Sequence, residues 1–264
     1  MSVAIVTGSG SPTLPDFESV ETRDVETPYG SATVAAGRFA GIDVLHVSRH
    51  GEGHVRLSNH VDHRANLWAL RELGARAVVG CTACGALDGD IPLGTLIVFD
   101  DLHFPANRLP DGRLCTWFDE PGAADRGHWI FERPFSDALR RALVEAAADA
   151  GVHARDGGCY GHVDGPRFNT RAEIAQLARA GVTAVSQTGG PETVLCGEAE
   201  LPYALIGFAT DYANGIMPTA TPVEELIRLM GESTARFAAV LAAALPRLDL
   251  DALEPPGVVY RFER

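Results

Sequence analysis

The chain has 264 residues, of which 46% are hydrophobic, and a formal net charge of −13. This length fits one α/β domain over residues 1–264, and the lack of a basic run argues against nucleic acid or an anionic membrane as the main partner. The sequence contains no lysine, which excludes Schiff-base catalysis and the lysine of a phosphate-binding P-loop.

The cysteines and the lack of targeting features predict a reduced, cytoplasmic protein. The five cysteines are odd in number and mostly stand in apolar runs. Cys81 and Cys84 form a CxxC motif, but no second pair or downstream histidine cluster accompanies it, so we expect neither a metal site nor redox chemistry. We find no signal-peptide pattern and no apolar run long enough to cross a bilayer.

The first half of the chain predicts short strands around one helix. Each strand is a brief apolar run, and the helix has apolar residues at helical spacing before a glycine. We expect strands within residues 3–13, 31–39, 42–47 and 75–82, and a helix over residues 64–74. The strand at 75–82 opens into the small residues 83–86, which permit close backbone approach.

Polar groups follow three of these strands, and each could contact an anion. Ser9 lies in a glycine-rich turn, and Arg49 and His50 follow the strand predicted at 42–47. Thr82 ends the strand at 75–82 and precedes the amide of Ala83. A guanidinium binds a phosphate bidentately, and an imidazole could donate one more bond. The alternatives are a plain turn, a surface ion pair with a satisfied histidine, and a tight packing turn.

Outside residues 184–214, the second half of the chain predicts further strands and three helices. We expect a strand over 94–101, an irregular segment over 103–134, a helix over 135–151, a strand, a Gly-Pro turn and a helix over 156–181, and a last helix over 221–245. The irregular segment is long and aromatic, which is typical of a functional or interfacial loop. The tail over about 247–264 is not assigned to any element.

The segment from 184 to 214 organises the candidate site. It predicts two apolar strands around a helix that begins near Pro191, and the strand ends deliver Thr188 and Asp211. Ligands of α/β sheets bind beyond the carboxyl ends of strands. Thr188 offers a donor for an anion, Glu192 an acceptor for sugar hydroxyls, and Asp211 an acid for a heterocycle. Alternatively, Thr188 and Glu192 form a helix cap, and Asp211 merely ends a strand.

Six sequence blocks together resemble one family. They are SRHGEGH, VDHRANLWAL, TACGAL, DGPRFNTRAE, GGPETVL and ATDYANG, and they resemble the 5′-methylthioadenosine phosphorylase branch of the trimeric purine nucleoside phosphorylases. The resemblance extends from about Ile5 to Leu245. It implies a mixed β-sheet, partly closed into a barrel and flanked by helices, and a homotrimer with active sites near the subunit boundaries.

The resemblance also implies roles for individual residues. It places phosphate at Ser9, Arg49, His50, Thr82, Ala83 and Thr188, and a purine nucleoside at Phe168, Asn169, Gln187 and Asp211. The 5′ group would contact His54, Pro222, Leu226 and the neighbouring subunit's copy of His128. Gln187 stands where the family has a methionine beneath the ribose, so it could bond a ribose hydroxyl or reshape the 5′ side. Ala213 replaces a second aspartate of the adenine-specific enzymes.

The implied activity is phosphorolysis of 5′-methylthioadenosine or a related 5′-deoxyadenosine, which gives adenine and a 5-substituted ribose 1-phosphate. Asp211 would share a proton with N7 of the leaving base, and inorganic phosphate would be the co-substrate, with no metal or organic cofactor. The alternatives are a 6-oxopurine or methylthioinosine phosphorylase, a nucleosidase that uses water, and a non-catalytic nucleoside-binding protein.

Overall fold

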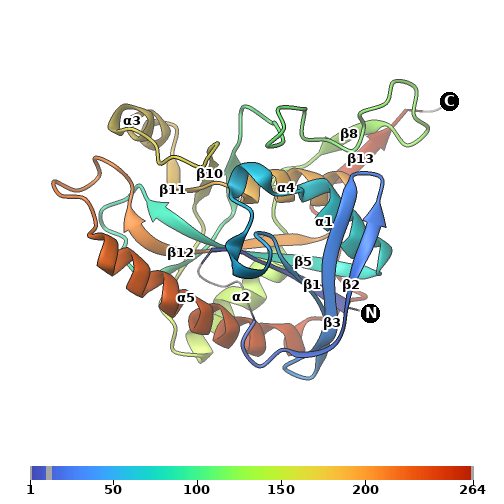
Figure 1. The fold of residues 1–264 in the computed structure, drawn as a ribbon, viewed down its shortest axis with the longest axis horizontal. Helices are drawn as coiled ribbons and strands as arrows, with labels where there is room; N and C mark the ends of the chain where they lie inside the picture. The colour runs from blue at the N-terminus through green and yellow to red at the C-terminus, as the bar shows by residue number, and fades with distance from the viewer. Residues whose placement is uncertain (1, 10–13, 263–264) are drawn as a thin grey trace.

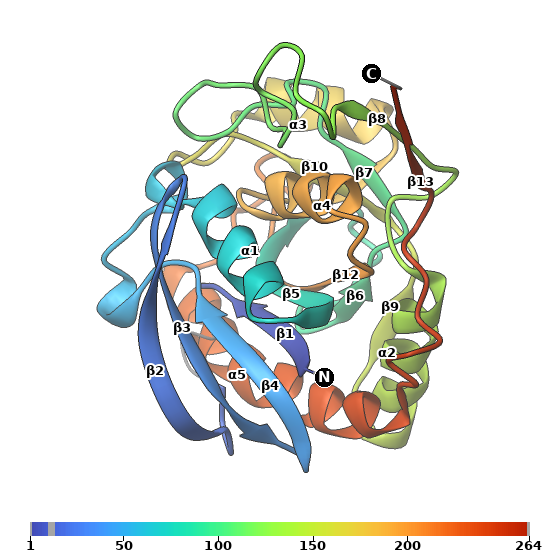
Figure 2. The same cartoon turned by 90° about the vertical axis from the view of Figure 1, so that its right-hand side faces the viewer.

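One mixed sheet of eleven strands forms the centre of the protein (Figures 1 and 2), in a computed structural model that describes residues 2–9 and 14–262. Its strands are β1 (Ser2–Thr7), β2 (Glu18–Thr27), β3 (Gly30–Phe39), β4 (Ile42–Ser48), β5 (Ala75–Ala86), β6 (Leu96–Val98), β7 (Asp101–His103), β9 (Ala154–Asp156), β10 (Cys159–His162), β11 (Val182–Ser186) and β12 (Tyr203–Tyr212). The main path runs β2-β3-β4-β1-β5-β11-β10-β7, and β12, β6 and β9 branch from β5.

The most apolar strands lie in the middle of this sheet. β1 runs parallel to β4 and β5, and β12 runs parallel to β5. Alternate residues of β1 face opposite sides: Ala4 and Val6 belong to one buried cluster, and Val3 and Ile5 belong to the other. Both faces are therefore covered, which explains why these strands are continuous apolar runs without polar alternation.

Helices form a layer on each face of the sheet. They are α1 (His63–Glu72), α2 (Asp137–Asp149), α3 (Arg171–Arg179), α4 (Gly189–Glu198) and α5 (Val223–Ala244). α1 and α4 bury apolar residues in one core, and α2 and α5 pack together over the other (Figure 2). No helix within residues 2–9 and 14–262 is long and apolar enough to span a membrane.

The partial barrel implied by the resemblance does not appear in the strand pairing. Across the described residues the pairs form a branched path through β5 and β12, and no ring of hydrogen-bonded strands closes. The protein thus has the expected mixed central sheet flanked by helices, but this sheet is open.

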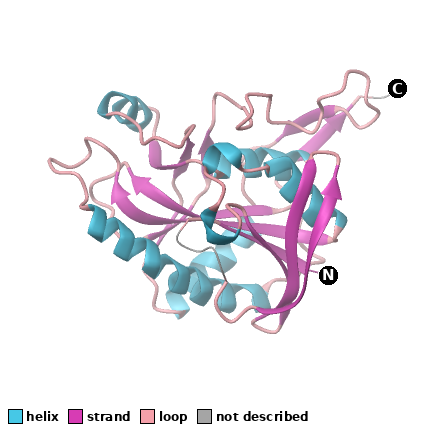
Figure 3. Cartoon of the chain, in the orientation of Figure 1, coloured by secondary structure: helices cyan, strands magenta, loops and turns pink. Residues whose placement is uncertain are grey.

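Three elements differ from the sequence predictions. β2 was not predicted, because its residues are almost all exposed and charged or polar, and it pairs only with β3 at the sheet edge. β5 continues through Ala86, so the small residues 83–86 belong to a strand and not to a turn. The unassigned tail contains β13 (Val258–Arg261), which pairs antiparallel with β8 (Gly127–Ile130) of the irregular segment (Figure 3).

Candidate functional site

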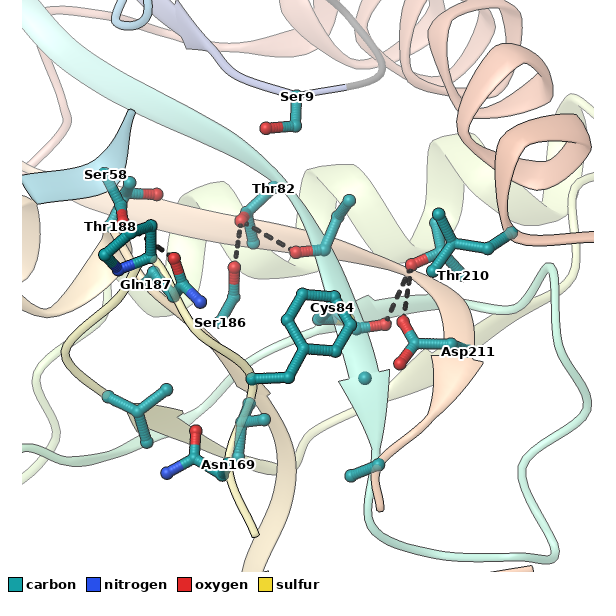
Figure 4. Close-up of a pocket in the computed structure, with 18 of the residues that line it drawn as sticks. Ser9, Ser58, Thr82, Cys84, Asn169, Ser186, Gln187, Thr188, Thr210 and Asp211 are labelled. Atoms are coloured by element: carbon teal, nitrogen blue, oxygen red, sulfur yellow. Dashed lines mark hydrogen bonds between the residues drawn. The ribbon is translucent and has the colours of Figure 1, made fainter. Parts of the chain in front are cut away.

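A cavity of about 300 Å³ opens beyond the carboxyl ends of β5, β11 and β12 (Figure 4). The site residues predicted from the sequence that line it are Ser9, His50, His54, Thr82, Ala83, Phe168, Asn169, Gln187, Thr188, Asp211 and Leu226. Three other predicted residues, Arg49, His128 and Pro222, do not line this cavity. Residues 10–13 of the predicted strand and turn over residues 3–13, which include Gly10, lie outside the described residues.

Arg49 is buried behind the cavity wall. Its side chain is 1% exposed, so the alternative of a surface ion pair is wrong. Nε and Nη2 donate to the two carboxylate oxygens of Glu192 at 2.7 and 3.0 Å, and Nη1 donates to the Cys81 carbonyl at 2.7 Å. Burial alone would lower the pKa of Arg49, but the Glu192 carboxylate raises it above its usual value. The guanidinium is therefore a fixed positive charge, and its Nη1 lies against Gly8 beside Ser9.

Glu192 does not face the cavity, so the expectation that it accepts bonds from a sugar is wrong. Its carboxylate binds Arg49 and also accepts a hydrogen bond from the Tyr203 hydroxyl at 2.8 Å. The side chain is 2% exposed. The acid in the first turn of α4 thus neutralises the buried arginine, which a buried ion pair requires.

His50 faces the cavity in a defined tautomer. Its Nδ1 lies 2.8 Å from the Arg56 carbonyl oxygen, which can only accept, so Nδ1 is protonated. Burial and the neighbouring charge of Arg49 lower the His50 pKa to about 4. The ring is consequently neutral near pH 7, and Nε2, 3.5 Å from Ser9 Oγ, is an acceptor. This differs from the donor role expected from the sequence, unless a ligand brings a proton to the ring.

Thr188 occupies the N-cap position of α4, but its side chain makes no capping bond, so the helix-cap alternative is not supported. The amides of Thr188 and Gly189 donate instead to the buried Tyr160 hydroxyl at 3.3 and 2.9 Å. The Gly190 amide donates to His162 Nδ1 at 3.3 Å. The first amides of this helix are thus occupied by side chains of β10, which leaves the Thr188 side chain to line the cavity.

Thr82 and Ser186 bring two hydroxyls together between β5 and β11. Their oxygens lie 2.9 Å apart, and Thr82 Oγ1 also lies 3.1 Å from the Ala83 carbonyl oxygen (Figure 4). Both residues line the cavity. Ser186 was not predicted as a site residue, although it stands at a strand end next to Gln187, where the same rule would have selected it.

Asp211 lies beside an irregularity in the pairing of β12. The register against β5 shifts between Ala209 and Asp211, and a bulge of this kind redirects side chains near functional sites. Thr210 Oγ1 donates to Asp211 Oδ1 at 2.9 Å, and Asp211 is 9% exposed. Burial raises the pKa of this carboxyl, and the Thr210 bond offsets part of that rise. Such an acid can retain a proton more readily than an exposed aspartate, as general acid catalysis needs.

Phe168 and Asn169 lie in the loop before α3, at the mouth of the cavity. The Phe168 ring is 62% exposed, so it is not a core residue and is free to contact a ligand. Asn214 Nδ2 donates to the Asn169 backbone oxygen at 2.7 Å, which joins this loop to the end of β12. The Asn169 side chain remains on the cavity wall with Asp211.

Gln187 is held from both ends of its amide. Its Oε1 accepts a bond from Ser58 Oγ at 2.7 Å (Figure 4). Its Nε2 donates to the Arg167 carbonyl at 3.3 Å. The side chain therefore links the loop before α1 to the loop before α3. Of the two alternatives for this position, a change in cavity shape agrees with these contacts, and Ser58 is a second lining residue that the sequence did not indicate.

The residues predicted for a 5′ group separate into two sets. His54 stacks on His50 with ring centroids 4.2 Å apart, and Leu226 reaches the cavity from α5. Pro222 is the N-cap of α5, and His128 lies on β8, where it pairs with Tyr260 of β13. His128 does not reach the cavity of its own chain, so its predicted role in a neighbouring subunit stays a prediction.

The described part of the chain contains no group of three or more His, Cys, Asp or Glu side chains that could hold a metal ion. Cys81 and Cys84 are both buried and unpaired. Burial raises the pKa of both thiols above the usual range. Neither thiol is thus suited to nucleophilic chemistry near neutral pH.

Comparison with known proteins identifies the family. The chain is 35% identical to a probable 6-oxopurine nucleoside phosphorylase of Thermococcus kodakarensis, over 92% of this chain and 91% of the relative. It is 31% identical to the S-methyl-5′-thioadenosine phosphorylase of Danio rerio, over 94% and 89%. The methylthioadenosine phosphorylase of Schistosoma mansoni, solved with adenine, superposes with a TM-score of 0.83 at 26% identity, over 93% and 91% of the two chains. The sequence model of the Phosphorylase superfamily matches residues 2–246, and the chain belongs to that family.

Proposed function

We propose that the protein catalyses phosphorolysis of a purine nucleoside and releases the free base and a ribose 1-phosphate. The observation that supports this most directly is the composition of one cavity. A buried acid, Asp211, lines the same cavity as several hydroxyls that can donate to an anion and as His50, whose Nε2 can accept the proton of a phosphate O–H group. A nucleosidase would need the acid without the anion site.

Charge development in the transition state explains why the reaction needs both the acid and the bound phosphate. Cleavage of the glycosidic bond builds positive charge on the ribose and negative charge on the leaving base. Asp211 donates its proton toward N7 and neutralises the base. Phosphate stabilises the cationic sugar and then attacks its anomeric carbon, so the C–N bond breaks as the C–O bond forms. No metal or organic cofactor takes part in this proposal.

The phosphate would be bound mainly by neutral donors. Ser9, Thr82 and Thr188 provide hydroxyls, and the amide of Ala83 adds a donor. His50 Nε2 can accept the proton of a phosphate O–H group. Arg49 supplies positive charge from behind the wall, where Glu192 fixes it. Because Glu192 balances this charge, the net field at the site is weaker than a free arginine would provide.

The base we propose first is adenine, with a 5′-methylthio or related group on the sugar. An ionised Asp211 accepts from the exocyclic amine, and a protonated Asp211 donates to N7. The methylthioadenosine phosphorylases among the relatives agree with this choice. A 6-oxopurine is the second candidate, because the Asn169 amide offers a donor and an acceptor that match O6 and N1–H, and several relatives are named for 6-oxopurines.

We also propose that the enzyme is a cytoplasmic homotrimer in which each chain presents His128 to its neighbour. His128 is exposed on β8, and Ile130 and Phe131 beside it are 56% and 44% exposed. Exposed apolar side chains gathered on one element are typical of an interface. The unpaired cysteines agree with a reducing compartment.

One assay tests the proposed function. Base release is measured from adenosine, inosine, guanosine and their 5′-methylthio analogues, with and without phosphate. We expect cleavage to require phosphate and to yield ribose 1-phosphate in equal amount to the base. Cleavage at the same rate in phosphate-free buffer would instead identify a nucleosidase, and binding without turnover would identify a nucleoside-binding protein.

A further inference from the structure

The loop between β10 and α3 carries Phe168 at the mouth of the cavity. Phe168 and Asn169 line the cavity from this loop, and the Phe168 ring is 62% exposed. The free energy needed to order a loop is subtracted from the affinity for a ligand, unless the loop is already held before the ligand binds. The hydrogen bonds that hold the loop backbone therefore influence how well Phe168 can serve a ligand.

Two amide side chains hold the backbone carbonyls on either side of Phe168. Gln187 follows β11, and its Nε2 donates to the Arg167 carbonyl oxygen at 3.3 Å. Asn214 follows β12, and its Nδ2 donates to the Asn169 carbonyl oxygen at 2.7 Å. The exposed ring is thus fixed through both of its neighbours in the chain, from two strand ends of the sheet.

The orientation of the Gln187 amide follows from its two partners. The Arg167 carbonyl can only accept, so the amide nitrogen faces it and Oε1 faces Ser58. Ser58 Oγ must then donate to Oε1, at 2.7 Å (Figure 4). A Cβ atom at position 165 would clash with both Gln187 Oε1 and Ser58 Oγ, so the backbone of Gly165 lies directly against this bond. Ser58 therefore fixes which end of the amide faces the loop.

We propose that Gln187 and Asn214 are positioning residues that hold Phe168 in place as a stacking surface for the purine base. This inference rests on the proposed function, because it takes a purine nucleoside as the ligand. Gln187 then acts on the base through the loop and Phe168, and not by a bond of its own to the ribose. Because the hydroxyls proposed for phosphate lie on other segments of the chain, release of the loop should weaken nucleoside binding and spare phosphate binding.

The first experiment compares the KM values for nucleoside and phosphate in Gln187→Met and Asn214→Ala. Methionine has the length of glutamine but cannot bond to the Arg167 carbonyl. We expect each variant to raise the nucleoside KM about fivefold, the size of one neutral hydrogen bond, and to change the phosphate KM by less than about twofold. The matched control is Gln176→Met, because Gln176 is exposed on α3 and does not line the cavity. This control should change neither KM.

A double-mutant comparison separates positioning from direct contact with the sugar. If Gln187 acts through Phe168, then Gln187→Met should add little to the nucleoside KM of a Phe168→Ala protein. A direct bond from Gln187 to a ribose hydroxyl would instead raise this KM by the same factor in both backgrounds. Ser58→Ala should likewise raise the nucleoside KM in the wild-type background and add little after Gln187→Met, because it acts by orienting the amide.

Trypsin provides a measurement that needs no enzymatic activity. The chain contains no lysine, so trypsin can cut it only after arginine. The carbonyl that Gln187 holds belongs to the Arg167–Phe168 peptide bond itself. We expect Gln187→Met to speed cleavage of this bond in the ligand-free protein about fivefold, because opening of the loop then breaks one hydrogen bond fewer. The Arg113–Leu114 bond joins two other exposed residues and is the internal reference, whose cleavage rate should not change.

Different results would refute different parts of the inference. Unchanged cleavage after Arg167 in Gln187→Met would show that the amide does not hold the loop. Equal factors in the two Phe168 backgrounds would assign Gln187 to the sugar instead. A rise in both KM values, or the same rise in Gln176→Met, would indicate general loosening and no positioning role. Wild-type protein that cleaves no purine nucleoside would overturn the proposed function and the role of Phe168, whereas the trypsin result would still decide whether Gln187 holds the loop.

Discussion

Replacement of Asp211 by asparagine tests the proposed chemistry at its most specific point. The side chain is 9% exposed, and burial raises its pKa, so it can hold the proton that the leaving base needs. Asparagine has the same shape but cannot transfer a proton to N7. Loss of general acid catalysis typically lowers a rate by about 10²–10⁴-fold, which corresponds to roughly 3–5 kcal/mol of transition-state stabilisation.

The Thr210 bond also predicts how the asparagine would be oriented. Thr210 Oγ1 donates to Asp211 Oδ1 at 2.9 Å, and only an oxygen can accept that bond. The amide oxygen should therefore occupy the Oδ1 position, with the NH₂ group in place of Oδ2. The NH₂ group of asparagine and the amine of adenine are both donors, so they cannot bond to each other. The same NH₂ group can donate to the O6 atom of a 6-oxopurine. We expect the activity ratio of methylthioadenosine to methylthioinosine to fall by at least about tenfold, since a mismatched polar group is left unpaired.

The assay is kcat/KM for both nucleosides at saturating phosphate, together with thermal unfolding. Stability should change little, because the Thr210 bond is kept and no charge is newly buried. Thr210→Val in the Asp211→Asn background removes the orienting donor, so part of the change in base preference should be lost. If Asp211→Asn retains methylthioadenosine cleavage within threefold of wild type, Asp211 is not the general acid. If the wild-type protein already prefers the 6-oxopurine, the proposed adenine specificity is wrong.

Three further predictions follow from other parts of the structure. Glu192→Gln should destabilise the protein by about 3–5 kcal/mol in urea unfolding, because it leaves the buried charge of Arg49 without an ionic partner. The folded variant should have a lower phosphate KM, because the positive charge behind the anion site is no longer balanced. Unchanged unfolding would contradict the described ion pair. Glu198, the last residue of α4, accepts hydrogen bonds from Thr116 Oγ1 and the Trp117 amide. Burial raises the pKa of Glu198 to about 6, so its contribution to stability is fully present below about pH 4.5, its unfolded value, and is lost as the pH rises through 6, a loss of about 2 kcal/mol. Glu198→Gln should flatten this part of a stability–pH profile. Co-expression of equal amounts of His128→Ala and Asp211→Asn should restore about a quarter of all active sites, or about one in three within mixed trimers, because His128 and Asp211 would come from different chains at each site. Failure of the mixture to exceed either variant alone would argue against a shared site.

The sequence was sufficient to predict which strands are central and where their ends converge. Buried strands need two covered faces, so continuous apolar runs marked β1, β5 and β12 without any knowledge of their partners. The polar residues that follow such strands meet at one edge of a sheet, and Ser9, Thr82 and Asp211 accordingly line one cavity. Strands that bury few of their own residues, or whose partner lies far away in the sequence, could not be predicted. β2 is held by β3 alone, and β13 is held by β8 across more than a hundred residues of sequence.

The orientation of each polar group was the part that the sequence could not determine. Glu192 and Arg49 are 143 positions apart, and only the folded chain shows that they neutralise each other and that Glu192 cannot serve a sugar. His50 changes from expected donor to acceptor because the carbonyl of Arg56 fixes its tautomer.

The sequence can therefore predict which polar residues lie at the strand ends beside the cavity, but the hydrogen-bond partners of each residue determine whether it donates or accepts. A threonine hydroxyl at a strand end can donate or accept, and the amino-acid sequence is the same in both cases. For Thr82 the difference comes from the Ala83 carbonyl oxygen, 3.1 Å from Thr82 Oγ1, because a carbonyl can only accept and so the hydroxyl donates to it, which leaves Thr82 Oγ1 to accept from Ser186 Oγ at 2.9 Å.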